Sequence, residues 1–120
     1  MVAQEQRDLA AAEQWYRKSL AISEKQGNEH GAASTYCQLG ILAGRRERFE
    51  EAGRWLIRSI LAFARWNDRH GAQRNAGNFM VFYKRAPASV RQKLAAMWSE
   101  AGLGDLPATG PESPNDAKEA

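Results

Sequence analysis

The chain has 120 residues, of which 26% are charged and 43% are hydrophobic, as in an ordinary single-domain protein. No stretch approaches the 18 or more apolar residues of a membrane span, and the charged residues 1–9 are not expected to form a secretory signal. The single cysteine, Cys37, excludes an internal disulfide, and we expect a cytoplasmic protein.

Five segments are predicted to be helices, because their apolar residues recur at steps of three and four. In chain order they cover residues 7–25, 29–43, 48–66, 69–84 and 88–101. None of these segments alternates as a strand would, and the short connections predict antiparallel neighbours.

Glycine, asparagine and proline set the predicted helix ends. Gly44 is expected to close the second helix, and Pro87 to stop the fourth and begin the fifth. From Gly104 onward the chain holds three prolines, two glycines and no aromatic residue, so residues 104–120 are predicted to be a disordered, acidic tail.

The net charge of +3 is distributed unevenly. Residues 1–40 carry four basic and five acidic side chains, and residues 94–120 carry one Lys against five acids. Residues 41–93 carry twelve Arg and Lys against four acids. This basic middle is a candidate binding face for an acidic partner, and the acidic end could screen it.

The sequence resembles itself when it is shifted by a fixed interval, the one that separates Trp15 from Trp55. The same shift brings His30-Gly31-Ala32 onto His70-Gly71-Ala72. A fixed period of this size indicates a stacked repeat protein, a class that usually binds other molecules.

The residue types at the helix positions of this repeat resemble those of the tetratricopeptide repeat family, in the variety whose repeats are about 40 residues long. Tyr36 and Leu39-Gly40 match the family's first helix, although Ala43 replaces its second aromatic residue and Met80 replaces the glycine of the next unit. The second-helix pattern is matched by Ala52, Leu56 and Ser59 and by Ala12, Tyr16 and Ser19.

The resemblance implies an all-α fold, an α-solenoid of stacked antiparallel helix hairpins. It places a repeat domain at residues 1–103, in which we expect 88–102 to be a capping helix. It also implies a protein- or peptide-binding scaffold with a basic concave groove for an acidic segment. The predicted groove residues are Ser34, Cys37, Ile41, Arg45, Arg74, Asn78, Val81, Lys84 and Arg85.

Two other functions stay open. The first is electrostatic nucleic-acid binding, less favoured than a protein partner, through the following arginines with Trp55 and Trp66: Arg45, Arg46, Arg48, Arg54, Arg58, Arg65, Arg69 and Arg74. The second follows from the alignment of Val2-Ala3 with Leu42-Ala43, the end of a first helix. The chain is then either a fragment of a longer array or a molecule that self-associates through Trp15, Tyr16 and Leu20.

Catalysis has no support, because no phosphate loop, nucleophile elbow or paired His-Glu motif is present. His30 and His70 are read as repeat equivalents rather than metal ligands, and Cys37 as a buried, inert thiol. We therefore expect no catalytic residue, no metal site and no cofactor.

Overall fold

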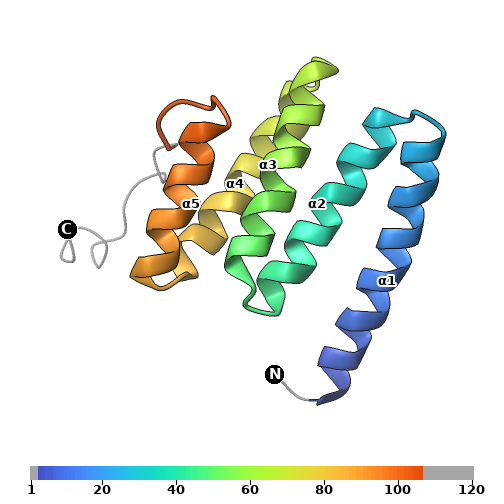
Figure 1. Cartoon of the computed structure of the whole chain (residues 1–120), viewed down its shortest axis with the longest axis horizontal. Helices are drawn as coiled ribbons and strands as arrows, with labels where there is room; N and C mark the ends of the chain where they lie inside the picture. Colours follow the sequence, from blue (N-terminus) through green and yellow to red (C-terminus); the bar gives the residue numbers. More distant parts are fainter. Residues whose placement is uncertain (1–2, 107–120) are drawn as a thin grey trace.

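The computed structural model describes residues 3–106, and these fold into a row of five helices (Figure 1). They are α1 (Ala3–Lys25), α2 (Glu29–Arg45), α3 (Phe49–Arg65), α4 (Arg69–Arg85) and α5 (Ala88–Glu100). Successive helices run in opposite directions, and α1 packs on α2 but on neither α4 nor α5. The arrangement is therefore an open stack of hairpins, as predicted, and not a closed bundle.

The turns repeat as regularly as the helices. The helices α2, α3 and α4 are equal in length and begin at equal intervals along the chain, at Glu29, Phe49 and Arg69. The residues two before these starts, 27, 47 and 67, lie in the left-handed region, at φ of +69°, +61° and +56°. A single left-handed residue stops each preceding helix without a long loop, and this keeps neighbouring helices in contact.

Two predicted helix ends were wrong. The first helix begins by Ala3 instead of Arg7, because residues 6–8, the repeat counterparts of the turn at residues 46–48, are helical in α1 and do not form a turn. Gly44 does not close α2, which runs on to Arg45. It is buried within α2, where a Cβ atom would lie 2.3 Å from the ring of Phe82, so its role is close packing.

The core lies mainly between α3, α4 and α5. Phe79, Leu56 and Leu94 are almost completely buried there, and the rings of Phe79 and Trp98 lie 4.9 Å apart. A smaller cluster joins α1 to α2 and α3 through Leu20, Ala32 and Leu39, with the partly buried rings of Tyr16, Tyr36 and Trp55.

The chain stays in contact with the core after Gly104, where the disordered tail was predicted to begin. The indole Nε1 of Trp98 donates a hydrogen bond to the carbonyl of Asp105 over 3.2 Å, and Leu103 and Leu106 pack against the core. Residues 104–106 of the predicted tail are thus attached to α5. The rest of that prediction, residues 107–120, lies outside the described residues.

Candidate functional site

A surface pocket of about 460 Å³ lies between α2 and α4. One face of α2 contributes Ser34, Cys37, Gln38 and Ile41, and α4 contributes Arg74 and Asn78. The α2 residues share a face because they are three, four and seven positions apart. The pocket joins helices that are not consecutive, so its shape depends on how α3 holds both of them.

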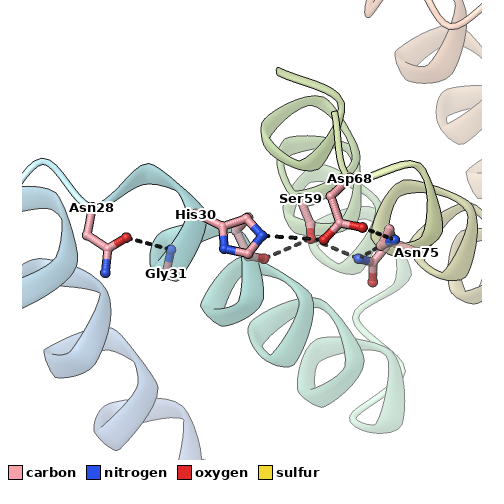
Figure 2. Close-up of polar contacts among 8 residues, drawn as sticks. Asn28, His30, Gly31, Ser59, Asp68 and Asn75 are labelled. Carbon is pink, nitrogen blue, oxygen red and sulfur yellow. Dashed lines mark hydrogen bonds and ion pairs between the residues drawn. The ribbon is translucent and has the colours of Figure 1, made fainter. Parts of the chain in front are cut away.

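A buried polar network fixes that spacing (Figure 2). Ser59 of α3 donates to the carbonyl of Ala33 in α2 over 2.8 Å, and its hydroxyl accepts from Nδ2 of Asn75 in α4 over 3.0 Å. Asn75 also donates to the carbonyl of Gly71 over 3.1 Å. Ser59 and Asn75 are fully buried, so this network links three helices where lost hydrogen bonds are costly.

The network reaches the pocket through Asn78. Nδ2 of Asn78 donates to Oδ1 of Asn75 over 3.3 Å, which orients the amide at the pocket wall. The side chain of Asn78 has no other hydrogen bond among residues 3–106, so its Oδ1 and second N–H can bind a ligand's backbone.

Arg74 is the charged residue of this pocket, and the lining contains no acidic side chain. Arg74 is exposed and forms no ion pair with the described residues. Cys37 is buried, as predicted. Burial raises the pKa of its thiol, while the charge of Arg74 and a hydrogen bond with Asn75 act in the opposite direction. The thiol is neutral at physiological pH and serves as apolar floor.

A second, larger pocket of about 940 Å³ opens at the edge of the stack, where the α2–α3 and α4–α5 turns lie side by side. Arg45 and Arg85 line it, and neither forms an ion pair within the described part of the chain. Its remaining lining is mixed in charge and polarity and consists of Gly44, Glu47, Arg48, Phe49, Glu50, Glu51, Arg54, Pro87 and Val90.

The predicted groove is therefore divided. Five of its residues meet in the smaller pocket, Arg45 and Arg85 lie in the larger one, and Val81 and Lys84 are exposed on α4 outside both linings. Gln38 and most residues of the larger pocket were not among the predicted groove residues. Arg45 and Arg85 occupy equivalent helix ends in successive repeats. This equivalence was the sequence signal that could have placed both arginines in one pocket at the same edge of the stack.

His30 and His70 do not form a shared site within residues 3–106. His30 extends from the start of α2 to Asp68, the N-cap of α4, with Nε2 and Oδ2 3.3 Å apart (Figure 2). The backbone amide of Gly71 and then His30 hold the pKa of Asp68 below its usual range. Asn28 caps α2 in the same way. Residues 3–106 contain no cluster of three or more potential metal ligands.

Four of the eight arginines considered for nucleic-acid binding form ion pairs within residues 3–106. Arg46 pairs with Glu13, Arg48 with Glu51, Arg54 with Glu50 and Arg65 with Glu29. Trp55 stacks on Tyr36 at 5.8 Å, and the guanidinium groups of Arg17 and Arg58 approach its ring. Trp66 is exposed at the end of α3.

The three residues of the predicted oligomer face have different surroundings. Trp15 is exposed on α1, whereas Tyr16 is half-buried and Leu20 is buried against α2. Leu20 faces the neighbouring helix and is unavailable to a partner, which corrects that part of the prediction.

Within residues 3–106, no helix combines the length and apolar character that crossing a bilayer demands. Residues 1–75, more than half of the chain, match the family described as Tetratricopeptide repeat. This match confirms the resemblance found in the sequence. The comparisons with curated proteins and with solved structures give no significant match.

Proposed function

This chain belongs to the tetratricopeptide repeat family, and we propose on that premise that its α2–α4 pocket binds an acidic segment of a protein partner. The family's repeats serve generally as protein-interaction scaffolds. The proposed role is binding, not catalysis. The observation that carries the proposal is the pocket lining, which joins one arginine, polar amides and an apolar floor without any carboxylate.

Each part of that lining has a task in the proposal. Arg74 pairs with a side-chain carboxylate of the ligand, where a guanidinium can form two parallel hydrogen bonds. Asn78 and Gln38 bond the ligand's backbone, as an amide can both donate and accept. Ile41 and the neutral thiol of Cys37 provide an apolar contact.

Arg85 extends the site toward the larger pocket. It lies three turns of α4 beyond Arg74, which corresponds to about 16 Å along the helix axis. An extended peptide covers this distance in about five residues. The proposed ligand thus carries two acidic residues about five positions apart, one for Arg74 and one for Arg85. Val81 and Lys84 lie between these two arginines in the sequence of α4.

Fluorescence anisotropy with a labelled peptide of that design tests the proposal. Replacement of Arg74 or Arg85 by Ala is expected to weaken binding about tenfold, because each removes a charge-assisted hydrogen bond. Arg69→Ala is the matched control, since it removes an exposed arginine from the same helix about 140° away from Arg74. Its affinity should stay within about twofold of the unmodified protein.

Two further arms separate the acidic peptide from other ligands. A peptide with Gln in place of both acids should bind at least tenfold more weakly. A labelled single-stranded oligonucleotide should bind weakly at physiological salt, because ion pairs occupy several of the arginines. Tighter oligonucleotide binding with a steep salt dependence, or equal peptide affinities for Arg74→Ala and Arg69→Ala, would contradict the proposal.

A further inference from the structure

One face of α1 carries a regular stripe of exposed residues. The stripe consists of Asp8, Ala11, Trp15, Lys18, Ile22 and Lys25, all of which are exposed. Steps of three and four alternate along it, so its members lie within about 100° of the helix circumference. This is the spacing of the seam along which two helices pack side by side.

Two members of the stripe are large and apolar. Trp15 is 71% exposed and Ile22 is 58% exposed. Their counterparts one repeat later are covered by α2, because Trp55 stacks on Tyr36 and Ala62 is fully buried beside Ala33. Figure 1 shows α1 at one end of the row, with α2 as its neighbour. The stripe thus has the composition of a face that packs against a helix.

The charges and sizes along the stripe fit a second copy of itself. In an antiparallel pair related by a two-fold axis midway between Trp15 and Lys18, Asp8 of one copy faces Lys25 of the other. Ala11 then faces Ile22, a small residue against a large one. Trp15 faces Lys18, a combination suited to a cation–π contact.

We propose that the protein forms a two-fold symmetric dimer through this α1 stripe. Each complementary contact occurs twice, once on either side of the axis. The opposite alignment, a parallel pair in register, would place each lysine beside its own copy and is unfavourable. The proposal requires no occupant of the α2–α4 pocket, so it is independent of the proposed peptide binding.

Sedimentation velocity of the full chain from about 1 to 500 μM tests the proposal. We expect the weight-average mass to rise from monomer toward dimer across this range, because a single helix pair forms a small interface. Trp15→Lys should raise the dimer dissociation constant at least tenfold. Val81→Lys is the matched control, since Val81 is 52% exposed on α4, and its dissociation constant should not change.

Charge exchange tests the antiparallel register. Asp8→Lys and Lys25→Asp should each weaken the dimer several-fold, and the double variant should restore it, because the exchanged charges again face each other. Circular dichroism establishes that each variant is folded. A chain that is monomeric at every concentration overturns the proposal, as does a dimer that Trp15→Lys leaves intact. Failure of the double variant to recover overturns the proposed pairing.

Discussion

Removal of the Asn75 side chain tests whether the buried network holds the pocket together. Asn75→Ala deletes the hydrogen bonds to Ser59 and Gly71, at 3.0 and 3.1 Å, and the acceptor of Asn78. The Ser59 hydroxyl keeps the carbonyl of Ala33 as its acceptor, and Asn78, which loses its side-chain bond, is half-buried, so water can replace the lost acceptor. The cost is therefore set by the bonds lost and by the space vacated.

The two fully buried bonds contribute about 1 kcal/mol each. The bond from Asn78 is longer and only partly buried, and it adds less. The vacated amide leaves a small cavity, which adds several tenths of a kcal/mol. We expect the free energy of unfolding to fall by about 2–3 kcal/mol and the midpoint of thermal unfolding to fall by roughly 10–15 °C.

Urea titration and thermal melts monitored by circular dichroism measure these changes. Gln73→Ala is the matched control, because it removes an exposed amide side chain from the same helix, and it should cost under about 0.5 kcal/mol. The Ser59→Ala and Asn75→Ala double-mutant cycle should give a coupling of about 1 kcal/mol. A loss below about 1 kcal/mol for Asn75→Ala, or additive single mutants, would refute the reasoning.

Three further predictions concern individual residues. Asp68→Asn keeps a capping side chain but removes the charge. Because the pKa of Asp68 is lowered in the folded state, the carboxylate's contribution to stability is complete above about pH 4 and is lost as pH falls through that lowered pKa. The wild type should therefore lose more thermal stability than the variant between about pH 5 and 2. The thiol of Cys37 should react with a disulfide reagent at pH 8 at least about tenfold more slowly in the native protein than in denaturant, and equal rates would contradict its burial. Gly44→Ala should destabilise the protein by about 1–3 kcal/mol, because Phe82 must move. Gly77→Ala should stabilise it by about 0.5–1 kcal/mol, because no atom lies within 4 Å of the added carbon. Urea midpoints in the reverse order would contradict this assignment of the two glycines.

The order, direction and approximate extent of the helices were predictable from the sequence, because local signals set them. Caps such as Asn28 and Asp68, together with the three-to-four spacing of apolar residues, act within one helix. Gly44 was misread for the same reason. A local rule treats glycine as a stop, whereas the packing of this glycine in α2 is determined by Phe82, which lies two helices further along the chain in α4.

The division of the predicted groove was not predictable from a list of groove positions. Residues on one face of α4 are spread along its axis, so Arg85 lies about 16 Å beyond Arg74 and belongs to a different depression. Leu20 presented a related difficulty. Periodicity shows that α1 has an apolar face but does not show which part of it α2 covers.

The equal interval between helix starts has a consequence for how such a chain can change length. Because Glu29, Phe49 and Arg69 begin helices of equal size after equivalent turns, a tandem duplication of one helix pair with its turns would join two ends that already fit each other. Each added copy would supply its own Ser59- and Asn75-type bonds to its neighbours. Variation in the number of repeats can therefore lengthen the stack of helices without a new type of turn between them.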